Sequence, residues 1–268
     1  MRRSRFTAYV TSLLLATACA LTGATMAQAS QLAATGGYVA LGDSYSSGVG
    51  AGSKISSSGS CDRSTKAYPY LWAAAHSPST FDFKACSGAR TGDVLANQLG
   101  TLSTSTALVS ISVGGNDAGF SDVMTTCVLQ SDSACLSRIA TAKAYVDSTL
   151  PGLLDKVYSA ISAKSPSAHV VVLGYPRFYK LGTTCLGLSA TKRSGINGAA
   201  DYLDAALAKR AADHGFTFGD VRTKFTGHEI CSGSSWLHSL NLLSITESYH
   251  PTAAGQSGGY LPVLTSAL

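Results

Sequence analysis

The sequence predicts an α/β fold, a three-layer sandwich with a central parallel sheet. Apolar runs of strand length alternate along the chain with longer segments of helical character. Such alternation implies parallel strands joined by right-handed crossovers, with helices covering the faces of one sheet. The sequence shows no internal repeat and no linker, because its Ser/Gly-rich stretch at 53–60 is too short to separate two domains.

The individual elements follow from these runs in chain order. Five apolar runs are expected to form strands: 38–41, 81–85, 107–113, 169–173 and 216–218. Three longer segments are expected to form helices: 67–75, 136–163 and 190–212, the second interrupted or restarted at Pro151. A last helix is expected after Pro251, because proline suits the first turn of a helix.

The first 29 residues have the pattern of a signal peptide. Three arginines, an apolar stretch at 9–21 and the small residues of Ala27-Gln28-Ala29 follow one another. The apolar stretch is shorter than the roughly 20 residues that a membrane-spanning helix needs, and no later segment reaches that length. We therefore expect a secreted, extracellular protein without an integral membrane segment, whose mature chain at 30–268 is a single domain.

Cleavage after residue 29 changes the charge and the number of cysteines. It removes three of the 20 basic residues and leaves 17 against 15 acidic ones, a formal charge of +2 that does not favour nucleic-acid binding. The six remaining cysteines are Cys61, Cys86, Cys127, Cys135, Cys185 and Cys231. An even number in a secreted chain favours three disulfides, and we expect nearest neighbours to pair. A zinc site is the alternative, but the chain has no C-x-x-C pair, so no metal is expected.

Ser44 and His250 are the candidate nucleophile and base. Ser44 lies in Gly42-Asp43-Ser44-Tyr45 after the first predicted strand, and His250 lies in Ser248-Tyr249-His250-Pro251 near the other end. A serine attacks an ester carbonyl when a base removes its proton, and histidine is the usual base. A strand-end Gly-Asp-Ser is also ordinary turn chemistry, so the pair gains force only from the residues between the two blocks.

Two further turns offer donors for an oxyanion. Gly88 follows the second predicted strand, and Asn116 follows Gly114-Gly115 at the end of the third. The N–H groups of Ser44 and Gly88 and the Asn116 amide can stabilise charge that develops in the transition state. Because parallel strands end at one edge of the sheet, we expect these residues and Tyr175, after the fourth strand, to meet there.

The blocks that contain Ser44, Gly88, Asn116 and His250 follow one another in this order across nearly the whole mature chain. In this they resemble the SGNH or GDSL hydrolases. The resemblance implies that Ser44 is the nucleophile, that Ser44, Gly88 and Asn116 form the oxyanion hole, and that His250 is the base. The six cysteines and Trp236-Leu237-His238 resemble features of one branch of this family, the secreted bacterial lipases, esterases and phospholipases. The resemblance therefore implies a cofactor-free enzyme that hydrolyses carboxylic esters, with fatty acyl lipids as substrates, through an acyl-enzyme.

Two residues depart from the family pattern. Tyr45 stands where many members have Leu, at a position that need not touch the chemistry. Glu247 stands three residues before His250, where the family often places Asp. Either the Glu247 carboxylate orients His250 in a triad, or the Ser248 carbonyl accepts the Nδ1–H in a Ser-His dyad, and we favour the dyad.

Two competing motifs are rejected. Residues 255–259 match G-x-S-x-G, but that arrangement needs a later histidine and none follows Ser257. His228-Glu229 begins like a zinc protease motif, but Ser232 stands where the second histidine should be.

An acyl chain needs an apolar groove beside the nucleophile. Candidate lining residues near the expected rim are Tyr175, Pro176, Phe178, Trp236, Leu237, Leu240, Leu242 and Leu243. We expect a monomeric protein that acts on a lipid or small ester, the lipid at a lipid–water interface. The alternatives are a phospholipase or polysaccharide deacetylase on the same site, and a non-catalytic secreted binding domain that would need neither Ser44 nor His250.

Overall fold

The computed structural model describes residues 36–268, and the predicted signal peptide at 1–29 lies outside the described residues. Five strands form one sheet: β1 (Gly37–Gly42), β2 (Phe81–Phe83), β3 (Thr106–Ser112), β4 (His169–Leu173) and β5 (Thr217–Gly219). All paired strands are parallel, and their order is β2-β1-β3-β4-β5. Each strand lies at one of the five predicted apolar runs. The second ends early, at Phe83, because the N–H groups of Lys84 and Ala85 both turn to the Ala40 carbonyl.

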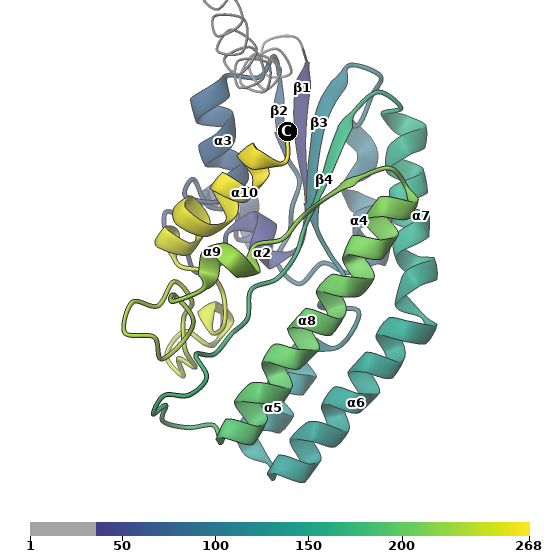
Figure 1. The fold of residues 1–268 in the computed structure, drawn as a ribbon. Helices are drawn as coiled ribbons and strands as arrows, with labels where there is room; N and C mark the ends of the chain where they lie inside the picture. The colour runs from purple at the N-terminus through teal and green to yellow at the C-terminus, as the bar shows by residue number, and fades with distance from the viewer. Residues whose placement is uncertain (1–35) are drawn as a thin grey trace, which may run out of the picture.

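Helices cover both faces of the sheet (Figure 1). One face carries α3 (Tyr68–His76) and α10 (Leu261–Ser266), and the other carries α4 (Thr91–Asn97), α7 (Leu150–Lys164) and α8 (Ala190–Asp213). Strand β1, which lies between β2 and β3, is buried along its whole length, which explains its continuous apolar run. The predicted three-layer α/β fold is confirmed.

Three helices extend beyond the carboxyl end of the sheet (Figure 1). They are α5 (Phe120–Leu129), α6 (Asp132–Ser148) and the first half of α8, and α6 contacts both of the others. The helical segment predicted at 136–163, with an interruption or restart at Pro151, is two helices, α6 and α7. Pro151 lies in the first turn of α7, where a missing N–H costs no hydrogen bond, so the break falls before the proline.

The remaining elements are short. They are α2 (Ser44–Ser47), α9 (Arg222–Phe225), the 3-10 turns η1 (Ser56–Cys61), η2 (Leu99–Thr101) and η3 (Ile245–Glu247), and the π-helical turn η4 (Gly255–Tyr260) that leads into α10. Three disulfides join Cys61 to Cys86, Cys127 to Cys135 and Cys185 to Cys231, the nearest-neighbour pairs expected from the sequence.

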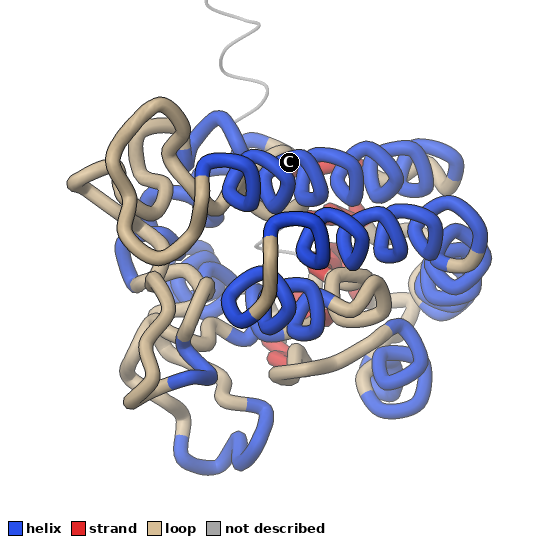
Figure 2. The backbone as a smooth tube through the Cα atoms, turned by 90° about the horizontal axis from the view of Figure 1, so that it is seen from below, coloured by secondary structure: helices blue, strands red, loops and turns tan. Residues whose placement is uncertain are grey.

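The strand order places a crevice beside β1. The chain leaves β1 for β2 on one side and reaches β3 on the other, and ligands bind beyond the carboxyl ends of strands at such a switch point. The short helix α2 begins there, directly after β1. Figure 2, seen from below, shows long loops gathered on one side of this end and helices on the other.

Candidate active site

Ser44 is held at the end of β1 by a tight turn. Gly42 has φ +120°, and a Cβ there would collide with the Ser112 carbonyl oxygen of β3, so the position requires glycine. The buried Gln98 side chain accepts from the Gly42 N–H and donates to the Gly42 carbonyl, at 2.7 and 2.9 Å. Asp43 caps α2, and Ser44 is its first residue, so the Ser44 N–H has no acceptor within the helix.

His250 reaches Ser44 from the other end of the chain. Its Nε2 lies 2.7 Å from the Ser44 Oγ. Desolvation lowers the pKa of His250 to about 4, and the backbone carbonyls of Ser248, Thr246 and Glu247 oppose that shift. The ring is therefore neutral at neutral pH, which is the form that can accept the Ser44 proton.

The other ring nitrogen faces backbone. The Nδ1 of His250 is buried, and no atom of residues 36–268 meets the geometry of a full hydrogen bond to it. Among the nearby carbonyls, that of Ser248 raises the His250 pKa most. In the same part of the chain no hydrogen bond or ion pair joins the Glu247 carboxylate to His250. This arrangement agrees better with the Ser248 carbonyl than with Glu247 as the group that orients the ring.

The segment that carries His250 is held by backbone pairing. The His238 N–H donates to the His250 carbonyl at 3.0 Å, and the Tyr249 N–H donates to the His238 carbonyl at 2.9 Å. Tyr249 has φ +68°, a left-handed conformation that costs roughly 1–2 kcal/mol for a residue with a Cβ. The Tyr45 hydroxyl donates to the Tyr249 carbonyl at 2.8 Å, and the Tyr45 ring lies 5.3 Å from the His250 ring. Tyr45, where many family members have Leu, thus packs beside the His250 ring.

The candidate oxyanion donors meet at the same place. Gly88 has φ +77° in the loop after β2, and Asn116 lies in the turn after β3. One N–H of the Asn116 amide donates to the Ala89 carbonyl at 3.0 Å, which leaves the second for a ligand. The Asp117 carboxylate accepts from the backbone and hydroxyl of Thr91, and this contact ties the two turns together.

Ser44, Gly88, Asn116 and His250 line one end of a cavity of about 480 Å³, and the convergence expected at the strand ends is present. Helices α5, α6 and α8 supply most of its apolar wall. Their residues in the wall are Phe120, Val123, Met124, Val128, Leu129, Ala142, Val146, Ile196, Ala199, Ala200 and Leu203. Among the described residues no cluster of three or more His, Cys, Asp or Glu side chains is arranged to hold a metal ion.

The predicted groove is partly wrong. Tyr175, Phe178, Leu240 and Leu242 line the cavity, but Pro176, Trp236, Leu237 and Leu243 do not. The Trp236 ring stacks on His228 at 3.7 Å, and Leu243 is 98 % exposed. The prediction missed the helical wall, because the apolar residues of α5 and α8 have the spacing of ordinary core residues.

Asp43 has no separate role in the prediction from sequence, although its carboxyl group is buried beside Ser44. Its Oδ1 accepts from the Tyr45 N–H at 3.0 Å and from the Ser112 hydroxyl at 2.7 Å, and its Oδ2 accepts from the Tyr175 hydroxyl at 2.5 Å. Burial raises the pKa of Asp43 to about 6, and the hydrogen bonds from Tyr175, Ser112 and the Tyr45 N–H oppose the rise. Only the Asp-Ser pair in sequence pointed to this residue.

A serine paired with histidine at the switch point of a parallel α/β sheet, beside an apolar cavity, defines a serine hydrolase. The chain belongs to the GDSL-like lipase/acylhydrolase family, whose model matches residues 40–257. It is accordingly a carboxylic ester hydrolase.

Relatives and solved structures agree with this assignment. The chain is 77 % identical over 267 residues, the full length of both proteins, to Lipase 1 of Streptomyces coelicolor. Its fold is similar to that of phospholipase A1 from Streptomyces albidoflavus (TM-score 0.86, 68 % identity, covering 88 % of this chain and 100 % of that one). It is also similar to the extracellular lipase of Streptomyces rimosus (TM-score 0.85, 67 % identity, covering 87 % and 100 %).

Proposed function

We propose that this protein is a secreted, monomeric lipase that hydrolyses fatty acyl esters through an acyl-enzyme on Ser44. The observation that carries the proposal is the 2.7 Å contact between the Ser44 Oγ and the His250 Nε2 at the end of an apolar cavity of about 480 Å³. A cavity of this size and lining suits an acyl chain. A polysaccharide would need polar partners along the same wall, so the deacetylase alternative is disfavoured.

The steps follow from the positions of the groups. His250 takes the Ser44 proton as the Oγ attacks the acyl carbonyl, and the Ser44 N–H, Gly88 N–H and Asn116 amide stabilise the oxyanion. His250 then gives the proton to the leaving alcohol. A water molecule, deprotonated by His250, hydrolyses the acyl-enzyme and frees Ser44. The Ser248 carbonyl orients His250, so Ser44 and His250 act as a dyad.

Phospholipids are a second class of substrate that one observation favours. The similar structure from Streptomyces albidoflavus is that of a phospholipase A1, with 68 % identity over nearly the whole fold. We propose that the same site also accepts phospholipid esters.

Exposed apolar side chains at the cavity support action at a lipid surface. Leu129, Leu242 and Ile245 line the cavity and are 76, 82 and 59 % exposed, and Leu243 beside them is 98 % exposed. A patch of this kind marks a surface that meets lipid or protein. Across residues 36–268 no helix is both long and apolar enough to cross a bilayer. Export through the signal peptide at 1–29 would bring the enzyme to such a surface outside the cell.

A fluorophosphonate probe tests the nucleophile. The probe should label Ser44, with loss of activity on p-nitrophenyl esters in proportion to labelling, and Ser44→Ala should lose both. The matched control is Ser257→Ala, an exposed serine in the rejected G-x-S-x-G segment, which should keep full activity. Labelling elsewhere, or an active Ser44→Ala, would refute the mechanism.

The substrate class needs a separate measurement. Mixed-chain phosphatidylcholine and triacylglycerol, offered as vesicles and emulsions, should both release fatty acid, with long chains preferred over acetyl esters. Preference for acetylated polysaccharide would contradict the proposal and leave Ser44 as the nucleophile of a different esterase.

A further inference from the structure

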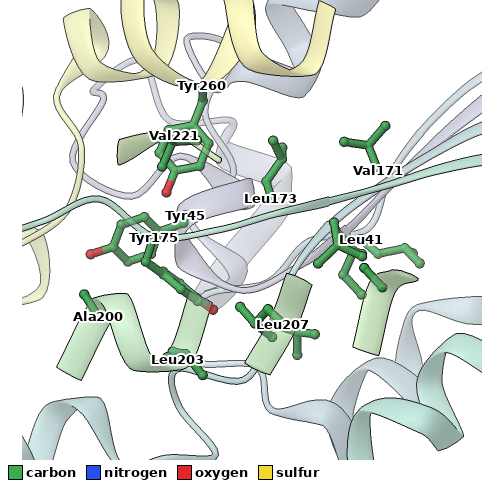
Figure 3. Packing of buried hydrophobic residues seen from close by; sticks show 14 of the residues in the cluster. Leu41, Tyr45, Val171, Leu173, Tyr175, Ala200, Leu203, Leu207, Val221 and Tyr260 are labelled. Atoms are coloured by element: carbon green, nitrogen blue, oxygen red, sulfur yellow. The ribbon is translucent and has the colours of Figure 1, made fainter. Parts of the chain in front are cut away.

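Tyr175 lies between the parts of the active site. It follows β4, and its backbone N–H donates to the buried Asp204 carboxylate at 2.9 Å, which fixes the start of the loop. Its ring packs edge-on against Tyr45 with 5.0 Å between centroids. Figure 3 shows both rings above Ala200 and Leu203 of α8. The ring is therefore confined on several sides, and its hydroxyl has a fixed place.

That hydroxyl joins two turns. It donates to the Asp43 Oδ2 at 2.5 Å, and it accepts from the Gly115 N–H at 3.3 Å. Asp43 directly precedes Ser44, and Gly115 directly precedes Asn116. One hydroxyl group thus contacts both the turn that carries the nucleophile and the turn that carries the candidate oxyanion amide.

No other donor replaces it. The Ser112 hydroxyl and the Tyr45 N–H both donate to the Asp43 Oδ1, and within residues 36–268 the Tyr175 hydroxyl alone donates to Oδ2. Without it, a buried carboxylate oxygen and a buried N–H both lose their partner, and buried polar groups without partners shift to find new ones. The two turns would then be free to move relative to each other.

We propose that the Tyr175 hydroxyl is a positioning group, which sets the distance between Ser44 and the Asn116 amide by bonding Asp43 and Gly115 together. The inference rests on the proposed role of Ser44 as nucleophile. Tyr175 touches no reacting atom in this role. It acts through the geometry of the oxyanion hole, so its removal should affect the chemical step more than substrate binding.

Tyr175→Phe removes the hydroxyl and keeps the ring in the cavity wall. On a soluble ester such as p-nitrophenyl butyrate, kcat per site titrated by fluorophosphonate should fall about tenfold to a hundredfold, as small misplacements of catalytic groups do. The KM should stay within about twofold, since the apolar lining is retained. The matched control is Tyr158→Phe in α7, whose buried hydroxyl has no hydrogen-bond partner among the described residues and whose loss should leave kcat unchanged.

Counting sites by titration separates positioning from folding. A purely structural role would lower the number of titratable sites and leave kcat per site at the wild-type value, and that result would overturn the proposal. So would an equal fall in Tyr158→Phe. If Tyr175→Phe yields no folded protein, Asp43→Asn weakens the same contact from its other end, and unchanged kcat per site would again overturn the proposal. An active Ser44→Ala would instead refute the underlying function.

Discussion

The two sides of the active site are built in different ways. Ser44, Gly88 and Asn116 lie in the turns that follow the carboxyl ends of β1, β2 and β3, so the sheet sets where these turns begin. His250 lies in a long segment between α9 and η4 whose regular structure is limited to the 3-10 turn η3 and isolated bridges. The nucleophile side is built on the buried strands of the core, whereas the base is held by backbone hydrogen bonds within its own segment and by side-chain contacts such as that of Tyr45 with the Tyr249 carbonyl.

The two sides also differ in what must break before each of them can move. Opening the His250 segment would break its pairing with residues 236–238 and the hydrogen bond from the Tyr45 hydroxyl to the Tyr249 carbonyl, but it would break no hydrogen bond between strands of the sheet. A shift of β1 or β3 would break the core. Substitutions on the two sides should therefore fail in distinguishable ways.

The largest expected effect joins both sides. His250→Ala should lower kcat by about 10⁶-fold, because a serine without its base is a poor nucleophile. Ser44→Ala should do the same, and the double variant should be no worse than either single one. Rates of p-nitrophenyl ester hydrolysis in the three variants measure this, and additive losses would contradict a Ser-His unit.

Removal of the Cys185–Cys231 bridge tests the side of the active site that carries His250. The two cysteines are 46 positions apart in the sequence, and replacement of both by Ser should reduce the free energy of unfolding by about 4 kcal/mol. Hydrogen exchange should accelerate at 228–252 before it does in β1 or β3. The control is the Cys127–Cys135 bridge, which closes 8 residues; its loss should cost about 2.5 kcal/mol and leave exchange around His250 unchanged.

Asn116→Ala tests the side of the active site that is built on the sheet. Loss of one oxyanion donor should lower kcat by about 10²–10³-fold with little change in KM, because the amide acts on charge that exists only in the transition state. Asn97→Ala at the exposed end of α4 is the matched control. A rise in KM at constant kcat would assign Asn116 to substrate binding.

The pH profile reports on the burial of the base. An ordinary histidine, with pKa about 6.5, is about nine-tenths protonated at pH 5.5 and inactive as a base in that form. Because burial lowers the pKa of His250 to about 4, kcat/KM should persist as the pH falls through 6.5 and be lost only near 4. An acid limb near 6 would point instead to Asp43, whose pKa is raised to about 6.

The smallest expected effect concerns Glu247. Glu247→Gln should change kcat less than about threefold, as substitutions outside the site do. A loss of about 10⁴-fold, as for a misoriented imidazole, would restore the triad. The kcat values of the wild type and of Glu247→Gln are both measured at pH 8, where the wild-type imidazole is neutral.

The sequence predicted the side of the site that the sheet builds. Turn residues at strand ends are local signals, so Ser44, Gly88 and Asn116 could be placed from pattern alone. The orientation of His250 could not be predicted in this way, because it depends on pairing with residues 236–238 and on the left-handed conformation of Tyr249. Neither feature has a recognisable local sequence pattern. The same limit explains the groove. Trp236 was predicted to line the groove, but its ring stacks on the ring of His228 instead.

The distance along the chain between nucleophile and base has a consequence in time. Ser44 and His250 are separated by 206 residues, and every strand of the sheet lies within residues 37–219. Every strand residue is therefore synthesised before His250, whereas α10, which covers one face of the sheet, is synthesised after it. Any fragment that ends before His250 lacks the proposed base, so we expect the chain to have no hydrolytic activity on lipids until its last segment has been made and folded.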